Sequence, residues 1–309
     1  MKNEETEFFG KAVRSGLAAI VGPPNAGKST LMNHLLGQKI SIVTPKPQTT
    51  RNRILGVVNG DDYQVVLIDT PGLHRTSQML NREMVRLAME SLTEVDLVVF
   101  LIDISLGLPP KVLEEKRKEM AGYMKQVSCP AILVLNKIDL VEKATLLPQI
   151  TWYSELYPFD AVVPVSALKG DGTDTLLTEL VKRLPLGPRY FPEDIPTDAS
   201  ERFLVGEIIR EKLFLLTGQE IPYSSAVLID SFKEDRQKKL VTIHATIVLE
   251  RASQKGIVIG RKGHKLKSIG TAARLDIEKL IGSKTLLKLW VKVKKNWSTN
   301  QQFLKELGL

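Results

Sequence analysis

A glycine-rich segment near the N-terminus has the residue types and spacing of a phosphate-binding loop. Gly22, Gly27, Lys28 and Ser29 occupy the defining positions of the pattern G-x-x-x-x-G-K-[ST], between an apolar run at residues 17–21 and a helix expected to begin near Lys28. In that setting, backbone amides and the helix N-terminus surround a phosphate, Lys28 binds the β- and γ-phosphates, and Ser29 ligates Mg²⁺. The nucleotide contacts predicted here are Gly22, Pro23, Pro24, Asn25, Ala26, Gly27, Lys28, Ser29 and Thr30.

A second phosphate motif, Asp69-Thr70-Pro71-Gly72, follows the apolar run at residues 65–68. An aspartate at the end of this strand can hold the Mg²⁺ shell, and the Gly72 amide can reach a γ-phosphate. On its own the motif is a turn signal, but its position one strand beyond the phosphate loop favours a phosphate sensor. The predicted contacts are Asp69, Thr70, Pro71, Gly72 and Leu73.

A third motif, Asn136-Lys137-Ile138-Asp139, indicates which base is bound. A carboxylate such as Asp139 accepts two hydrogen bonds from the N1–H and 2-amino group of guanine, which adenine cannot offer. A site built on such donors rejects an analogue lacking them by about 10⁴-fold or more. The predicted base contacts are Asn136, Lys137 and Asp139, together with Ser166, Ala167 and Leu168, whose backbone amides can bind the guanine O6.

The elements that must position these loops are predicted from apolar runs that alternate with helical stretches. Runs at residues 17–21, 65–68, 97–102, 131–135 and 161–165 indicate a mainly parallel sheet in an α/β fold. Residues 53–59 and 63–69 flank Gly60-Asp61-Asp62 and predict a hairpin with one antiparallel edge strand. The motifs then meet at the carboxyl ends of the strands, where open α/β sheets bind ligands.

Four phosphate or base motifs in this order resemble the translation-factor class of P-loop GTPases. The resemblance implies a first switch at residues 48–51 whose threonine ligates Mg²⁺, and Thr50 is favoured over Thr49 because a Thr-Arg pair recurs in related GTPases. It also implies that Asn25 either helps to hold K⁺ in place of an arginine finger or braces the loop, and both roles stay open. Leu73 replaces a water-orienting glutamine, so slow intrinsic hydrolysis is expected. The catalytic set is Asn25, Lys28, Thr50 and Gly72, and the metal ligands are Ser29, Thr50 and Asp69.

Composition and charge divide the chain into domains. Four prolines within residues 184–197 predict a linker, because proline fixes φ and removes a hydrogen-bond donor. We therefore expect an N-terminal extension at 1–14, a GTPase domain at 15–184, a linker at 185–199 and a second domain at 200–309. Residues 201–309 contain 21 Lys and Arg against 11 Asp and Glu. This excess of positive charge favours binding to a polyanion or to an anionic membrane surface.

The basic domain contains a loop of the form G-x-x-G between an apolar run and a predicted helix at 264–281. With a predicted αββααβ order, this loop resembles that of a type II KH domain, which binds single-stranded RNA. The loop contacts predicted for RNA are Ile259, Gly260, Arg261, Lys262, Gly263 and Lys265. In the tail, Lys292, Lys294, Lys295 and Trp297 are predicted to add phosphate contacts and a stacking surface, whereas Trp290 is assigned to the core.

A GTPase domain joined by a short proline-rich linker to such a KH domain resembles the Era family, which acts in small ribosomal subunit assembly. The resemblance covers about residues 15–309 and departs at Pro23 and Ala26, where the family commonly has arginine and valine. It implies a GTP-hydrolysing switch with GTP or GDP and Mg²⁺ that binds the 3′ end of 16S ribosomal RNA and the 30S subunit. It further implies a loose peripheral association with the inner membrane. The acidic residues at the N-terminus are not those of a signal or transit peptide, so we expect a cytoplasmic protein, and we expect it to be a monomer.

Two other functions are compatible with parts of this sequence. A non-catalytic RNA-binding adaptor would use the nucleotide structurally, and GTP turnover on addition of RNA would count against it. A membrane-remodelling GTPase would use the basic region on lipid, but the sequence shows no hydrophobic insertion element. No apolar run reaches the roughly 18 residues that span a bilayer, and the single cysteine, Cys129, excludes an internal disulfide.

Overall fold

The computed structural model describes residues 12–73, 79–106, 110–218, 220–235 and 237–308. The chain divides into two compact units. The first is formed within residues 1–41, 50–76 and 84–198, and the second within 42–49, 77–83 and 199–309. Residues 74–78, which follow Leu73, and most of the predicted N-terminal extension lie outside the described residues.

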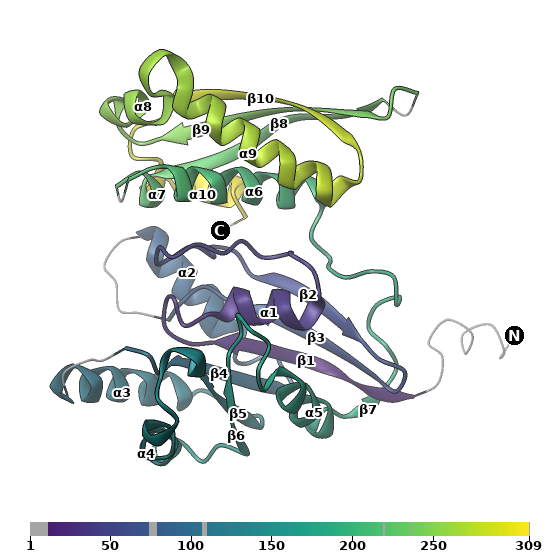
Figure 1. The fold of residues 1–309 in the computed structure, drawn as a ribbon, viewed down its shortest axis with the longest axis vertical. Coiled ribbons are helices and arrows are strands. Elements are labelled where there is room, and N and C mark those ends of the chain that lie inside the picture. Colours follow the sequence, from purple (N-terminus) through teal and green to yellow (C-terminus); the bar gives the residue numbers. More distant parts are fainter. Residues whose placement is uncertain (1–11, 74–78, 107–109, 219, 236, 309) are drawn as a thin grey trace, which may run out of the picture. The chain divides into compact units, whose positions relative to one another are not determined.

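The first unit is a mainly parallel α/β sheet, as predicted (Figure 1). Within the described residues it has seven strands, with the main path β2-β3-β1-β4-β5-β6 and β7 paired to β1. The strands are β1 (Val13–Val21), β2 (Ile54–Asn59), β3 (Tyr63–Asp69), β4 (Leu97–Asp103), β5 (Ala131–Asn136), β6 (Ala161–Val165) and β7 (Leu186–Gly187). The antiparallel partners β2 and β3 form the predicted hairpin, and β2 lies at the edge.

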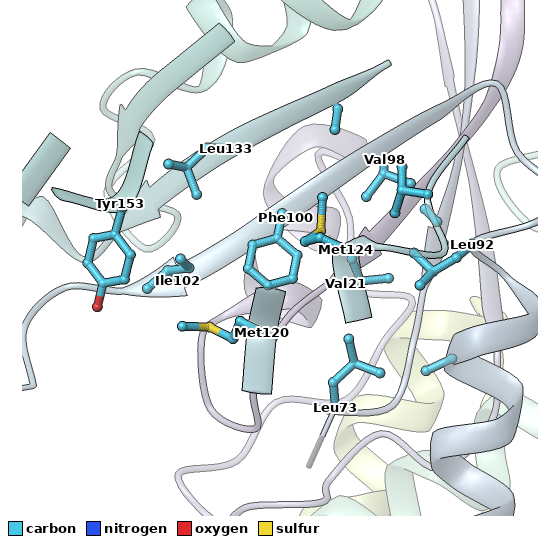
Figure 2. Close-up of a cluster of buried hydrophobic side chains, with 14 of the residues drawn as sticks. Val21, Leu73, Leu92, Val98, Phe100, Ile102, Met120, Met124, Leu133 and Tyr153 are labelled. Carbon is cyan, nitrogen blue, oxygen red and sulfur yellow. The ribbon is translucent and has the colours of Figure 1, made fainter. Parts of the chain in front are cut away.

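Helices cover the sheet because its central strands are apolar on both faces. They are α1 (Lys28–Leu36), α2 (Met79–Glu90), α3 (Pro110–Met124), α4 (Lys143–Ser154) and α5 (Thr173–Arg183). Figure 2 shows the buried cluster to which β1, β4 and β5 contribute Val21, Phe100 and Leu133, while α2 to α4 add apolar side chains. Leu73 is part of the same cluster and is 5% exposed. The alternation of apolar runs and helical stretches predicts helices between the strands, but no residue range was predicted for α4 or α5.

The predicted linker is bound to the first unit along much of its length. Leu186 and Gly187 pair with Val13 and Arg14 as the short strand β7. Further along, the carbonyl of Pro196 accepts a hydrogen bond of 2.9 Å from the Val57 amide. β1 therefore begins at Val13, earlier than the domain start predicted at residue 15, because Val13 pairs with β7 and Arg14 pairs with both β7 and β3.

The second unit has the element order expected of a type II KH domain. Its helices and strands are α6 (Glu201–Leu216), α7 (Glu220–Tyr223), β8 (Ser225–Asp235), β9 (Leu240–Leu249), α8 (Ala252–Ile259), α9 (His264–Ile281), β10 (Lys284–Val293) and α10 (Gln301–Glu306). Ser200 caps α6 as its residue type predicts, since its side chain accepts from the Phe203 amide. The strands form a sheet in the order β10-β9-β8, with α9 alongside it (Figure 1).

Candidate nucleotide and RNA sites

Three hydroxyls meet one buried carboxylate at the carboxyl end of β3. The Ser29 Oγ lies 2.6 Å from the Asp69 Oδ2 and 2.8 Å from the Thr50 Oγ1, and the Thr50 Oγ1 is 3.4 Å from the same carboxylate oxygen. The predicted metal ligands Ser29, Thr50 and Asp69 therefore lie together, although they come from α1, the segment before β2, and β3. Ser41 also donates to the Asp69 Oδ2, at 2.7 Å, a contact that no sequence motif predicts.

The chemistry of this group fits Mg²⁺, which prefers oxygen ligands and usually shares its shell with phosphates and water. Asp69 is completely buried, and its Oδ1 has no hydrogen-bond partner among the residues that the structure describes. Burial raises the pKa of the Asp69 carboxyl, while the Ser29 hydroxyl, the Lys28 charge and two further hydroxyls act in the opposite direction. A cation here would satisfy the unpaired oxygen and hold Asp69 in its charged form.

Thr50 and Thr49 are adjacent but have different partners. The Thr49 Oγ1 is 2.6 Å from the Thr44 Oγ1 and donates to the Lys46 carbonyl at 2.7 Å. Thr50 instead joins Ser29 and Asp69. This geometry favours Thr50 as the metal ligand, and the assignment stays a prediction.

We expect Thr50→Ala to impair Mg²⁺-dependent GTP binding and hydrolysis by about tenfold or more, because it removes one oxygen from the predicted cation shell. Thr49→Ala is the matched control and should remain within about twofold of the unmodified protein, because the Thr49 hydroxyl is also buried but bonds to Thr44 and Lys46 and adds no oxygen to the predicted cation shell. GTP hydrolysis titrated with Mg²⁺ measures both. Equal effects of the two substitutions would contradict the assignment to Thr50.

Lys28 begins α1 and lies within the phosphate-binding loop. Its Nζ donates to the carbonyls of Gly22 and Pro23 at 3.1 and 3.0 Å. Burial lowers the pKa of Lys28 to about 8, while the charge of Asp69 acts to raise it. A bound phosphate would add negative charge next to the ammonium group and favour its protonated form.

The Asp69-Thr70-Pro71-Gly72 turn packs directly against the phosphate-binding loop. A Cβ placed on Gly72 would lie 2.8 Å from the Cα and the ring of Pro24, so only glycine allows this approach. The next amide, that of Leu73, donates to the Gly22 carbonyl at 3.0 Å. Because the Leu73 side chain is buried in the core, it does not orient a water molecule (Figure 2).

Asn25 lies at the tip of the loop, where it is exposed and adopts a left-handed conformation with φ of 62°. Its neighbour Ala26 is buried and its carbonyl accepts a hydrogen bond of 2.7 Å from the Asn136 Nδ2. These observations place Asn25 on the solvent side of the loop and leave both of its predicted roles open.

The base motifs are connected by hydrogen bonds at the carboxyl ends of β5 and β6. The Asn136 Oδ1 accepts from the Ala167 amide at 2.9 Å, so one amide side chain joins the phosphate loop to the Ser166-Ala167-Leu168 segment. The Asp139 Oδ1 accepts from the Ser166 Oγ at 2.7 Å. This hydrogen bond fixes the carboxylate that is predicted to bind guanine, and Leu168 stays exposed beside it.

Asp103, at the end of β4, is a further residue of this region that the sequence analysis did not predict. Its Oδ2 accepts from the Lys137 Nζ at 2.5 Å, and its Oδ1 accepts from the Ser105 Oγ at 2.6 Å. The pair holds the Lys137 stem in place beside the base motif. The sequence could have indicated Asp103 as a site residue, because this aspartate ends an apolar strand in the same way as Asp69.

The predicted RNA loop joins α8 to α9 in the second unit. Gly260 has φ of 71°, and a Cβ there would lie 2.6 Å from the Lys265 Cβ. Arg261, Lys262 and Lys265 are exposed, and the Gly263 amide donates to the Gly260 carbonyl at 3.1 Å. Ile259 ends α8 and is half-buried. The loop therefore presents two glycines and three cationic side chains on one short turn.

The tail residues predicted to bind RNA do not form one surface. Trp297 is fully buried, its Nε1 donates to the Ser224 carbonyl at 3.1 Å, and its ring packs against Phe303. The prediction that Trp297 stacks on bases is therefore wrong. The Lys294 ammonium lies 3.6 Å from the centre of the Phe303 ring, while Lys295 is exposed.

The two tryptophans of this region have the reverse of their predicted environments. Trp290, assigned to the core, lies on β10 and is 48% exposed, and Lys292 is exposed on the same strand. The alternation of β10 explains this placement, because Leu287, Leu289 and Val291 occupy the positions that pack into the core.

A parallel sheet with its phosphate and guanine motifs at one edge defines a P-loop GTPase domain, and here it is joined to a KH domain. The family described as 50S ribosome-binding GTPase matches residues 17–137, and the KH domain family matches residues 220–298. GTPase Era of Geobacter metallireducens is 50% identical over 295 residues, covering 96% of this chain and 97% of that protein. GTPase Era of Geobacter sp. strain M21 is 51% identical, covering 96% and 98%. The chain belongs to the Era family of GTPases.

Two solved structures are similar over nearly the whole chain. A variant of Aquifex aeolicus Era bound to GDP and AlF4⁻ is 39% identical with a TM-score of 0.90, covering 96% of this chain and 99% of that one. A structure of Era in complex with MgGDPNP and nucleotides 1506–1542 of 16S ribosomal RNA is 40% identical, with the same TM-score and coverage. None of the helices in the part of the chain described here has the length and apolar character needed to cross a bilayer.

Proposed function

We propose that this GTPase binds the 3′ end of 16S ribosomal RNA through its KH domain and acts as a switch in assembly of the 30S subunit. One observation supports the proposal most strongly. A relative with the same two domains and a TM-score of 0.90 was solved with nucleotides 1506–1542 of 16S ribosomal RNA. The exposed cations around Gly260 and Gly263 support the same partner, because KH loops clamp the RNA backbone.

The switch would depend on residues at the carboxyl ends of the strands. Ser29, Thr50 and Asp69 would hold Mg²⁺, which neutralises phosphate charge when it is bound. Lys28 would bind the β- and γ-phosphates, and the Gly72 amide would reach the γ-phosphate. Loss of the γ-phosphate would remove what holds Thr50 and Gly72 in place, so hydrolysis would release both segments.

The RNA proposal is tested by binding to a 16S fragment that ends at the 3′ terminus, with a fragment of shuffled sequence as the control. We expect tighter binding of the native fragment, by about tenfold or more, when the protein holds a non-hydrolysable GTP analogue. A footprint on total cellular RNA with GTP and with GDP would then locate the site. Equal affinity for both fragments, or a footprint elsewhere, would contradict the proposal.

The chemical step leads to a prediction about monovalent cations. Catalysis of phosphoryl transfer consists mainly of positioning and charge stabilisation, and an arginine finger is worth about 10³ to 10⁵ in rate. Leu73 orients no water, and Asn25 is exposed at the loop tip, where it could help to hold a K⁺ ion that stabilises charge in place of an arginine finger. We therefore expect hydrolysis to be several-fold faster in K⁺ than in Na⁺. Asn25→Ala should remove the difference and leave GDP binding intact.

Hydrolysis rates at equal ionic strength, saturating Mg²⁺ and with RNA present measure this effect. Lys39→Ala, on an exposed side chain after α1, serves as a control that should keep the K⁺ dependence. Equal rates in the two salts would leave Asn25 as a loop brace and assign the missing catalytic group to a partner.

The proposal also includes a cytoplasmic monomer bound to the 30S subunit, with a peripheral fraction at the inner membrane. The net charge of +8 and its concentration in residues 201–309 support attraction to polyanions and to anionic lipid alike. Sedimentation of cell extracts with and without ribonuclease tests it. Ribonuclease should release the protein from the 30S fraction and leave any membrane fraction unchanged. Protein that never sediments with the 30S subunit before the digestion would contradict the ribosomal assignment, and the absence of any protein on membranes would contradict the peripheral fraction.

A further inference from the structure

One face of the sheet in the second unit carries several exposed side chains in the described residues, although Ala226 and Val248 at one end of that face are buried. Ile243 and Ile247 of β9 and Leu289 of β10 pack into the core formed with α6, α8 and α9. Because side chains alternate along a strand, the intervening positions point to the opposite face. That face, here called the open face, is defined by Lys233, Thr242, His244, Lys288, Trp290 and Lys292.

An aromatic side chain lies on the open face, on the edge strand β10. Trp290 is 48% exposed, although it is one of the largest side chains in the domain. The His244 ring meets it edge to face, with ring centres 5.1 Å apart and an interplanar angle of 66°. This contact fixes the indole on the sheet surface while leaving much of it accessible, which is the arrangement on which a nucleic-acid base stacks.

Two cationic side chains flank the tryptophan on its own strand, and a third lies farther away on β8. Lys288 and Lys292 lie two residues before and after Trp290 on the same side of β10, and Lys233 lies across the sheet opposite Thr242. All three lysines are exposed, and within the described part of the chain none forms an ion pair with a carboxylate. The nearby Asp230 accepts a hydrogen bond of 2.8 Å from the Thr246 Oγ1. The open face is therefore positively charged as well as aromatic.

We propose that the open face is a second surface for single-stranded RNA, separate from the Gly260–Gly263 loop, with a base stacked on Trp290 and phosphates bound by Lys288 and Lys292. The proposal rests on the RNA-binding function proposed above and extends it to another part of the domain. The alternation of lysine and tryptophan along β10 favours RNA over a bilayer, because the lysines interrupt the apolar surface between Leu286 and Trp290 that a membrane would need.

Tryptophan fluorescence tests this surface directly, because the chain has three tryptophans and Trp297 is fully buried. In the full chain carrying Trp152→Phe, a 12-nucleotide oligouridine should quench the remaining fluorescence. Adding Trp290→Phe should abolish the quenching, because the responding indole is then gone. Quenching that persists without Trp290, or that never occurs, would overturn the proposal. Enhanced, blue-shifted emission with phosphatidylglycerol vesicles and none of the RNA quenching would assign the face to a membrane instead.

Affinity measurements separate this surface from the loop. We expect Trp290→Ala to weaken binding of the 12-mer by about 5- to 100-fold, and Trp290→Phe to retain most of the affinity, since Phe can still stack. Lys288→Glu with Lys292→Glu should weaken it further and reduce its salt dependence. Because these side chains are exposed, unchanged circular dichroism should show that each variant folds.

The loop variant Gly260→Asp/Gly263→Asp distinguishes failure of this proposal from failure of the proposed function. If the loop variant loses RNA and the open-face variants bind normally, the second surface is wrong and the KH site stands. If only the open-face variants lose RNA, the second surface stands and the loop assignment fails.

Discussion

Asp139→Asn is expected to reverse the base preference of the GTPase domain from guanine to xanthine. The substitution replaces a carboxylate that accepts two hydrogen bonds with an amide that can donate one. Two hydrogen bonds to a charged group contribute about 3 to 6 kcal/mol, so GTP affinity should fall by roughly 10² to 10⁴-fold. Xanthine carries an oxygen at C2 in place of the amino group, and the new amide can donate to it.

The structure adds a reason to expect a clean switch. The Asp139 Oδ1 accepts a hydrogen bond of 2.7 Å from the Ser166 Oγ, and an asparagine oxygen can keep that contact. The side chain should therefore stay in position while its second polar atom changes from acceptor to donor. Ser166→Ala, in contrast, should loosen the carboxylate without changing its chemistry, and so weaken GTP binding with no gain for xanthine.

Competition of GTP and XTP for a fluorescent guanine nucleotide measures the switch. Asp174→Asn makes the same chemical change at an exposed position in the first turn of α5 and serves as the control. A variant that still prefers GTP over XTP by the original margin would show that Asp139 does not read the base.

The sheet was predictable from the sequence because its strands are buried on both faces. Such strands read as continuous apolar runs, and the predicted run at residues 131–135 differs from β5 by one residue. The residue ranges of the helices α4 and α5 were not predicted. α4 contains Pro148 and has no clear apolar stripe, while Gly172 precedes α5 in a left-handed conformation that reads as a loop. For α4, packing against the sheet outweighs the local sequence signal. The helix α5 does have an apolar stripe, which includes the buried Leu176 and Leu180 four residues apart, so its sequence contained a helical signal.

The nucleotide-binding motifs could be recognised because each one has a fixed residue pattern and follows the end of a predicted strand. What the sequence could not supply were the contacts between motifs, such as the Asn136 side chain that joins Ala26 to Ala167. These depend on where separate loops meet in space. Ser41 illustrates the limit, since nothing in its neighbourhood marks it as a partner of Asp69.

The exchange of roles between Trp290 and Trp297 has a different cause. The alternation along β10 puts Trp290 in the same phase as Lys288 and Lys292, so the sequence itself indicated an exposed position. Trp297 follows the strand in a short irregular segment, where no period applies. Its burial depends on two contacts that no periodic pattern predicts. Phe303 lies in the next helix, and the Ser224 carbonyl is 73 residues away in the sequence.

Replacing Gly260 and Gly263 with aspartate is expected to reduce binding of single-stranded RNA by the KH loop by about 10²-fold or more, because it removes the backbone approach and adds two negative charges. At Gly260 the effect has a defined geometry. A side chain there adopts an unfavourable left-handed φ, and its Cβ would lie 2.6 Å from the Lys265 Cβ and 3.0 Å from the Lys265 amide nitrogen. The loop must therefore move away from the conformation that presents Arg261 and Lys262.

A charge-matched control separates loop geometry from overall electrostatics. Gln237→Asp with Lys238→Gln changes the net charge by the same two units at the turn between β8 and β9, at the other end of β9 from α8 (Figure 1). Filter binding of a single-stranded 16S 3′ fragment and of GTP measures both variants. The control should retain most of its RNA affinity, and both should bind GTP normally, because the nucleotide motifs lie in the other unit. A folded loop variant that binds the fragment as tightly as the control would mean that the KH loop does not contact this RNA.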